Sequence, residues 1–277
     1  MSWAPGSCRR PGTASNARPS GASPPPPRRA WRRSWSSPSS RRAPSTSIAE
    51  RRSGRLGPTR LLFVIGATAN ASVQAAVDEE MAQYNDIIQN NIHDSYRNLT
   101  HKTIAWLSWA VSRCPHVPIA LKVDDDVVVN PFNLQKQYHS MNQETISQRN
   151  KGKEAVGKIY GRIILAPAQR KGRWALTKEE YPGNYFPPYA TGAAYFIDNV
   201  ALKKLWEHVT LAPFLWIEDV FLTGMVARVA EVEHGWLNRL YLEEKLTKSL
   251  YKGNAIFLFE ASPWEAQWAW DRISKKT

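Results

Sequence analysis

The sequence is poor in cysteine and has no long apolar run. Its 277 residues contain two cysteines, which are too few for a disulfide framework. Cys8 lies in a segment rich in arginine, proline and serine, so Cys114 is expected to be unpaired. No stretch is long and apolar enough to span a bilayer, and no apolar segment follows the N-terminal charges as in a signal peptide. The sequence therefore argues against a disulfide-rich scaffold, and no membrane anchor is recognisable in it.

Acidic residues and lysine are almost absent from the first 60 residues. This region contains thirteen arginines, no lysine and one acid, Glu50, whereas the whole chain has a net charge of +13. The remaining residues are thus close to neutral, which argues against a nucleic-acid partner for the folded part. Because residues 1–58 also lack a hydrophobic period, we expect them to form a disordered tail, with residues 59–277 forming one domain. The alternative for the tail is an arginine-rich arm that binds nucleic acid or an anionic membrane.

Strand and helix patterns alternate from residue 61 onward. The run "LLFVIG" is typical of a buried strand, and helical, strand, helical and strand patterns follow it in turn. Asn130 and Pro131 have the residue types of a helix N-cap and first helical position. This alternation predicts an α/β fold with a central, mostly parallel sheet flanked by helices. The expected elements are strands at 61–66, 85–89, 118–123, 158–165 and 192–198, and helices at 73–84, 99–114, from 131, at 200–209 and after 219.

Three adjacent aspartates, Asp124, Asp125 and Asp126, lie between the apolar runs "IALKV" and "VVVNPF". Adjacent carboxylates repel one another, and a hard divalent cation that takes carboxylate oxygens relieves this repulsion. In an extended stretch, Asp124 and Asp126 would point to the same side. The pattern thus favours a site for a metal ion and a diphosphate. The alternative is a solvated strand end with helix-capping aspartates.

Two further segments contain residues that could take part in catalysis or in sugar binding. Glu218 and Asp219 lie in "WIEDVFLTG" before a helix, where a carboxylate can act as a general base or simply be stabilised by the helix N-terminus. The segment "GRWALTKEEYPGNYFPPYATGAAY" is dense in aromatic residues and proline. Its rings offer flat apolar surfaces suited to sugar faces, or they cover the core.

The order of these motifs resembles one enzyme family. From residue 61 to residue 224, "FVIG", "YNDIIQ", "DSYRNLT", "LKVDDDVVVNPFNL", "YFPPYATGAAYF" and "EDVFLTG" follow the pattern of the β-1,3-galactosyltransferases and their N-acetylglucosaminyltransferase relatives, glycosyltransferase family 31. The resemblance implies a GT-A-like fold and inverting transfer of galactose or N-acetylglucosamine from a UDP-sugar. It also implies Mn²⁺ as cofactor, a glycan acceptor on glycoprotein or glycolipid, no nucleic acid, and a Golgi membrane location.

The resemblance also assigns roles to individual residues. Asp219 is expected to be the catalytic base, with Glu218 beside it. Asp126 and Asp124 are expected to hold the metal, with His234 as a weaker match. The donor is expected to contact Asp124, Asp125 and Lys122, and the acceptor and donor-sugar loop is expected to contain Trp174, Tyr189, Gly192 and Ala193.

The chain also departs from the family pattern. The anchor helix and stem are not visible, and "AERRSGRLGPTR" stands where an arginine-rich element of the uridine pocket is expected. A divergent or N-terminally incomplete member with weakened donor binding is therefore expected. Asn70 and Asn98 lie in sequons and are candidate glycosylation sites. The alternatives are an inactive lectin-like or scaffolding relative, and a metal-dependent nucleic-acid-binding protein with a basic tail.

Overall fold

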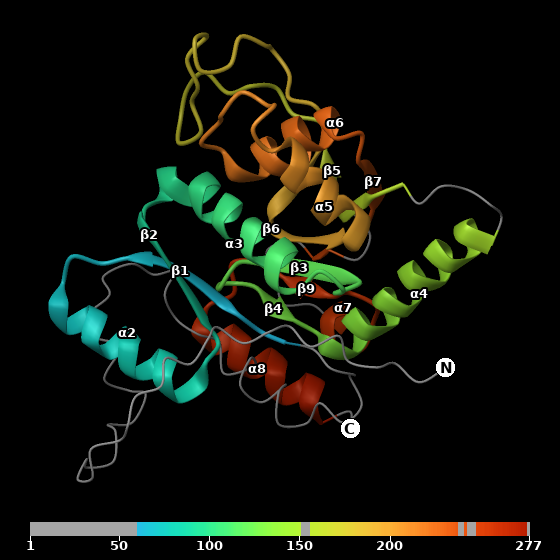
Figure 1. Cartoon of the computed structure of the whole chain (residues 1–277). Coiled ribbons are helices and arrows are strands. Elements are labelled where there is room, and N and C mark those ends of the chain that lie inside the picture. Colours follow the sequence, from blue (N-terminus) through green and yellow to red (C-terminus); the bar gives the residue numbers. More distant parts are fainter. Residues whose placement is uncertain (1–59, 151–155, 238–240, 243–247, 276–277) are drawn as a thin grey trace.

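The computed structural model describes residues 60–150, 156–237, 241–242 and 248–275 (Figure 1). The predicted tail of residues 1–58 lies outside the described residues. The elements in chain order are β1 (Phe63–Ala67), α2 (Ala71–Tyr84), β2 (Ile87–His93), η4 (Tyr96–Asn98), α3 (Leu99–Arg113), β3 (Ile119–Val123), β4 (Val128–Val129), α4 (Pro131–Asn150), β5 (Lys158–Ile164), β6 (Tyr189–Asp198), α5 (Asn199–His208), the π-helix η5 (Val220–Val226), α6 (Ala227–Val229), β7 (Glu233–Trp236), β8 (Tyr241–Leu242), α7 (Lys248–Tyr251), β9 (Phe257–Leu258) and α8 (Pro263–Ser274).

The described strands form three small sheets. One is the parallel pair β1–β2, one has the order β3-β6-β5-β7, and one has the order β4-β9-β8. The α/β class is confirmed, but the expectation of a mostly parallel sheet is wrong for the largest sheet. In that sheet β6 runs antiparallel to both β3 and β5, and β5 and β7 alone are parallel. The β5–β6 connection is an irregular loop rather than a crossover helix, so β6 can return antiparallel to β5.

Local capping signals set several helix starts. Asn130 Oδ1 accepts hydrogen bonds from the backbone N–H groups of Phe132 and Asn133, and Pro131 is the first residue of α4. The cap predicted from the sequence is thus confirmed. At the start of α8, Ser262 and Glu265 form a reciprocal capping box. The start of α4 thus agrees with the prediction, whereas α8 was not predicted from the sequence.

Helix α3 lies at the centre of the fold and positions the candidate site. It packs against β1 and β2 on one side and against α5 and η5 on another (Figure 1). Leu107 of α3 is fully buried in the main core, which gathers residues of β5, β6, α5 and η5. The residues of η5 are all buried, so the segment that follows Asp219 is held rigidly in this core.

The fold bears on the state of Cys114 and on the presence of membrane-spanning helices. Cys114 is buried and disulfide-bonded, so the expectation of an unpaired thiol is wrong. Among the described residues, no helix has both the length and the apolar character needed to cross a bilayer.

Candidate active site

The three aspartates form a turn at the end of β3. The backbone N–H of Val127 donates to the carbonyl of Asp124 at 3.3 Å, and all three aspartates are exposed. The expected extended geometry, with Asp124 and Asp126 on one side, is therefore wrong, because strand alternation does not apply within a turn. The aspartates do not cap α4 either, since Asn130 fills that role.

The electrostatics of this turn suit a cation. Partial burial, together with the charges of Asp126 and Asp124, raises the pKa of Asp125 to about 6. Partial burial and the charge of Asp124 also raise the pKa of Asp126. Adjacent carboxylates at a rim offer hard oxygen ligands, which Mn²⁺ or Mg²⁺ accept while keeping positions for water and phosphate. The carboxylates of Asp124 and Asp126 are thus of the chemical kind that such an ion binds.

The described residues contain no group of three or more histidine, cysteine or acidic side chains placed to hold a metal ion. His234 is therefore not brought together with Asp124 and Asp126. Its Nε2 donates instead to the carbonyl of Thr223 at 2.7 Å, and burial lowers the pKa of its ring. An ion held by the two carboxylates of Asp124 and Asp126 would complete its shell with water and substrate.

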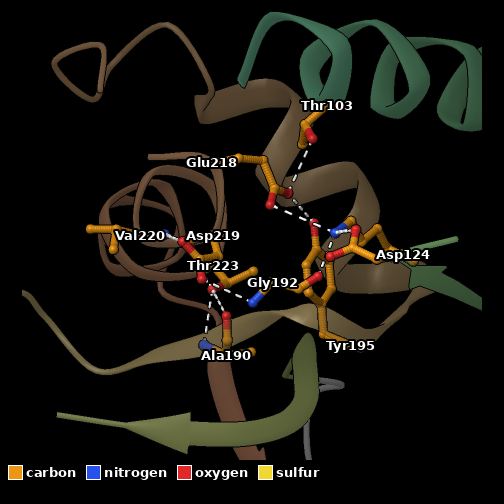
Figure 2. Close-up of polar contacts among 10 residues, drawn as sticks. Thr103, Asp124, Ala190, Gly192, Tyr195, Glu218, Asp219, Val220 and Thr223 are labelled. Carbon is orange, nitrogen blue, oxygen red and sulfur yellow. Dashed lines mark hydrogen bonds and ion pairs between the residues drawn. The ribbon is translucent and has the colours of Figure 1, made fainter. Parts of the chain in front are cut away.

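Asp219 is held at the start of η5 by two backbone amides. Its Oδ2 accepts from Gly192 N–H and its Oδ1 accepts from Val220 N–H, both at 2.9 Å (Figure 2). Burial and the charge of Glu218 raise the pKa of Asp219 to about 6, although the two amides act in the opposite direction. A carboxylate of this pKa is ionised at neutral pH and is a stronger base than an ordinary aspartate. Asp219 thus has the position and basicity of a general base, and the π-helix that follows it is a geometry often found at functional sites.

Glu218 has a different environment. It is 8% exposed, and its Oε1 accepts hydrogen bonds from the hydroxyls of Thr103 at 3.1 Å and Tyr195 at 2.5 Å (Figure 2). Burial and the charge of Glu218 hold the pKa of Tyr195 well above its usual value, so Tyr195 stays a donor. The fixed hydrogen bonds of Glu218 suit a structural and electrostatic role rather than proton transfer.

Lys122 links the acidic turn to the Glu218–Asp219 pair. Its Nζ lies 2.5 Å from Asp124 Oδ1 and 4.0 Å from Glu218 Oε2, and it also donates to the carbonyl of Gly192. Burial lowers the pKa of Lys122, but Glu218, Asp124 and Asp219 raise it, and the net shift is upward. Lys122 is thus a charged ammonium that neutralises carboxylates from two separate elements.

Strand β6 fixes the distance between the two acidic elements. Gly192 N–H holds Asp219, and the adjacent Ala193 carbonyl accepts from Asp124 N–H at 2.9 Å. A Cβ at Gly192 would lie 3.3 Å from Asp219 Oδ2, so a larger residue here would have to displace the Asp219 carboxylate by a few tenths of an ångström. The hydroxyl of Thr223 donates to the backbone carbonyl of Asp219 at 2.6 Å and so holds the main chain of this residue. The acidic turn and Asp219 are therefore both hydrogen-bonded to the same short stretch of β6, Gly192 and Ala193.

The residues expected in a sugar-binding loop fall into two groups. Tyr189, Gly192 and Ala193 belong to β6 and not to a loop. Tyr189 is buried, its ring packs edge-on against Phe186, and burial raises its pKa. Trp174 alone lies in the irregular loop, where it is 42% exposed and its Nε1 donates to Tyr96 OH at 2.7 Å. Its contact with η4 was not expected from the sequence.

The two sequon asparagines, Asn70 and Asn98, differ in their exposure to solvent. Asn70 caps α2 and is exposed, whereas Asn98 is half-buried and donates to the carbonyl of His93. The hydroxyl of Thr100, the third residue of the Asn98 sequon, is buried and donates to the carbonyl of Leu215. Of the two candidates, Asn70 is thus the more accessible in the folded chain.

The chain is similar in sequence to a family of known proteins. Residues 27–237 match the family model described as galactosyltransferase. The chain is 30% identical to beta-1,3-galactosyltransferase 4 of Mus musculus over 84% of its own length and 67% of the relative. It is 27% identical to beta-1,3-galactosyltransferase bre-2 of Caenorhabditis elegans over 69% of its length and 53% of the relative. Against beta-1,3-galactosyltransferase 5 of Homo sapiens, identity is 26% over 59% of the chain and 50% of the relative. The chain therefore spans between half and two thirds of the length of these relatives.

Proposed function

The chain belongs to the galactosyltransferase family, and from this premise we propose that it transfers a hexose from a UDP-sugar to a hydroxyl of a glycan acceptor. Galactose is the favoured sugar, with N-acetylglucosamine as the close alternative, and the bond formed is a β-1,3 linkage. The observation that supports this reaction best is Asp219, a carboxylate with a raised pKa. It is held by the amide of Val220 and by the amide of Gly192 on β6, the strand that also binds Asp124 of the acidic turn. Asp219 and Asp124 of the acidic turn thus contact adjacent residues of β6, which supports a proposal in which they act on the same donor.

The reaction that suits this geometry is a single displacement. Asp219 accepts the proton of the attacking acceptor hydroxyl, whose oxygen forms a bond to the anomeric carbon of the donor. The bond from that carbon to the diphosphate breaks, and UDP leaves with the electron pair. Attack opposite the leaving group inverts the anomeric carbon, and no covalent enzyme intermediate is needed. One base is sufficient, so Glu218 can remain bound to Tyr195 and Thr103.

Asp126 and Asp124 are the residues proposed to hold Mn²⁺. The ion, when bound, would neutralise charge on the departing diphosphate. Lys122 has the complementary role of holding Asp124 in place through its 2.5 Å contact. Asp125, which shares the same turn, is proposed to contact the donor together with Lys122. The acceptor class, glycoprotein or glycolipid, and a Golgi membrane location are proposed from the family alone.

A donor panel tests the proposed function. The purified chain is incubated with Mn²⁺ and each of several UDP-hexoses, and released UDP is measured with and without glycan acceptors. We expect Mn²⁺-dependent UDP release with UDP-galactose or UDP-N-acetylglucosamine, and loss of this release in a chelator. UDP binding without turnover for any donor would contradict the proposal and favour an inactive scaffolding relative.

Replacing Asp126 should weaken donor binding. The variant Asp126→Asn removes one anionic ligand, and we expect Mn²⁺-dependent UDP affinity to fall about tenfold or more. Calorimetric titration of UDP with and without Mn²⁺ measures the effect. Glu179→Gln, which changes an exposed carboxylate of the loop, is the matched control. Unchanged UDP affinity for Asp126→Asn would reject the metal assignment.

The pH dependence of transfer should report the ionisation of Asp219. The base must be deprotonated, so kcat should rise with pH and level off above about 6, the raised pKa of Asp219. In Glu218→Gln the neighbouring negative charge is lost, which lowers the pKa of Asp219. The acidic limb should therefore move to lower pH, as measured by kcat at saturating donor. A limb that stays in place would show that Asp219 does not govern it.

A further inference from the structure

A second cluster of charged and aromatic residues lies beside the candidate site. Arg173 lies over the ring of Tyr96, Tyr96 contacts Trp216 edge-on, and Arg97 lies over the ring of Trp216. We call these four residues the arginine ladder. The Arg173 guanidinium lies 4.4 Å from the Tyr96 ring centroid, the Tyr96 and Trp216 centroids are 6.3 Å apart, and the Arg97 guanidinium lies 4.3 Å from the Trp216 centroid. Three separate segments therefore contribute to one surface.

The guanidinium of Arg173 contacts rings alone among the described residues. Besides Tyr96, its other contact is the Trp174 ring at 5.8 Å, and no carboxylate in the described part of the chain pairs with it. Gly172 precedes it with φ of +87°, and a turn from Gly172 to Ala175 presents Arg173 and Trp174 to solvent. A guanidinium stacked on a ring keeps its in-plane N–H groups free to form a bidentate contact with an anion.

The rest of the ladder also offers more donors than acceptors. Arg97 is 65% exposed and has one long ion pair, 3.8 Å to Glu180. That carboxylate is partly engaged elsewhere, because it accepts from Thr177 N–H at 2.9 Å. The buried Nε1 of Trp216 has no acceptor among the described residues. The surface is thus short of anionic groups, and the exposed Lys171 adds a further positive charge beside Arg173.

The ladder is joined directly to the segment that carries the base. Trp216 lies three residues before Asp219, and the Thr100 hydroxyl donates to the carbonyl of Leu215 at 2.8 Å. One turn further along α3, Thr103 donates to Glu218. The start of α3 therefore contacts both the segment that carries Trp216 and the segment that carries the base.

From this arrangement we infer that the chain binds an acidic glycan as acceptor, with a carboxylate or sulfate of the glycan held by Arg173 and Arg97. This inference rests on the proposed function, since it names the acceptor class of the same site. The rings of Tyr96 and Trp174, 44% and 42% exposed, supply apolar surface for the sugar that bears the anion. The arginines would thus select acceptors by charge, while Asp219 acts on the hydroxyl.

Binding of three related glycans tests this inference without any donor. Lactose, sialyllactose and sulfated lactose are titrated into the purified chain by calorimetry. Charge-assisted bidentate contacts predict that at least one anionic glycan binds about tenfold more tightly than lactose, and that the preference shrinks at high salt. Preference for sialyllactose assigns a carboxylate, and preference for sulfated lactose assigns a sulfate. Equal affinity for all three glycans, or no binding of any, overturns the inference.

Variants test which residue causes the preference for anionic glycans over lactose. Arg173→Ala should remove most of this preference while affinity for lactose stays within about twofold, because the Arg173 side chain contacts exposed rings and not the core. Arg173→Lys keeps the charge but loses the planar fork and should be intermediate. Arg228→Ala, an exposed arginine on α6 outside the ladder, should leave the preference intact. An undiminished preference in Arg173→Ala contradicts the assignment. Because these titrations need no UDP-sugar, they can succeed or fail independently of the transferase assay.

Discussion

Asp219→Asn is expected to lower kcat for sugar transfer by about a thousandfold, within the range that general-base catalysis contributes. The amide group cannot accept the proton of the attacking hydroxyl. Asp219 accepts hydrogen bonds from the backbone amides of Gly192 and Val220, and in the described part of the chain no hydrogen bond joins its carboxylate to the acidic turn, so UDP affinity should change little. Single-turnover kinetics and UDP titration measure the two quantities separately.

The same variant distinguishes catalysis from support of the fold. An asparagine can accept one of the two amide hydrogen bonds and loses the other, so a modest fall in melting temperature is expected. Transfer within about tenfold of the original rate would reject Asp219 as the base. Loss of UDP binding together with transfer would instead show that Asp219 holds the site together.

Lys122→Met is expected to lower the free energy of unfolding by about 3 to 5 kcal/mol, the usual result of removing one partner of a buried ion pair. The side chain of Lys122 is 19% exposed and that of Glu218 is 8% exposed, so the carboxylate would be left in the core without its cation. Asp124 would also lose its 2.5 Å contact, and Mn²⁺-dependent UDP binding should weaken. Denaturant unfolding, followed by fluorescence, measures the stability change.

A double-mutant cycle identifies the cause of this loss. In Lys122→Met combined with Glu218→Gln, no uncompensated charge remains at this point of the core, so the pair of changes should destabilise less than Lys122→Met alone. The double variant should also still bind UDP more weakly than the unchanged chain, because Asp124 lacks its ammonium partner. Additive losses of stability would show that Lys122 and Glu218 do not interact as the 4.0 Å distance indicates.

Local features of the fold were largely predictable from the sequence. The Asn130 cap and Pro131 act within four residues of chain, so the start of α4 follows from residue type alone. The strands β3, β5 and β6 were located by their apolar patterns. Their directions were not, because the antiparallel pairing of β3 with β6 joins residues far apart in the sequence. Patterns of hydrophobicity locate a strand but do not fix its partner.

The sequence motifs named candidate site residues but did not predict how these residues are arranged in space. The aspartates and Asp219 were found through motifs, but the turn at Asp124 replaced the expected extended strand. The support of Glu218 by Thr103 and Tyr195 was missed, since Thr103 lies 115 residues away and a buried threonine has no distinctive sequence signal. Lys122 was expected to bind the donor, whereas it also connects the two acidic elements. Such links depend on tertiary packing, which pairs residues that no local pattern relates.

The anomeric configuration of the product tests the central claim most directly, that Asp219 acts as the single base of an inverting transfer. The chain is incubated with an α-linked UDP-hexose, Mn²⁺ and an acceptor, and the new glycosidic bond is assigned by proton NMR before any anomeric exchange. One displacement with Asp219 as base predicts a β-linked product from the α-linked donor. An α-linked product would require two displacements or a different mechanism, and it would contradict the assignment of Asp219 as the sole catalytic base.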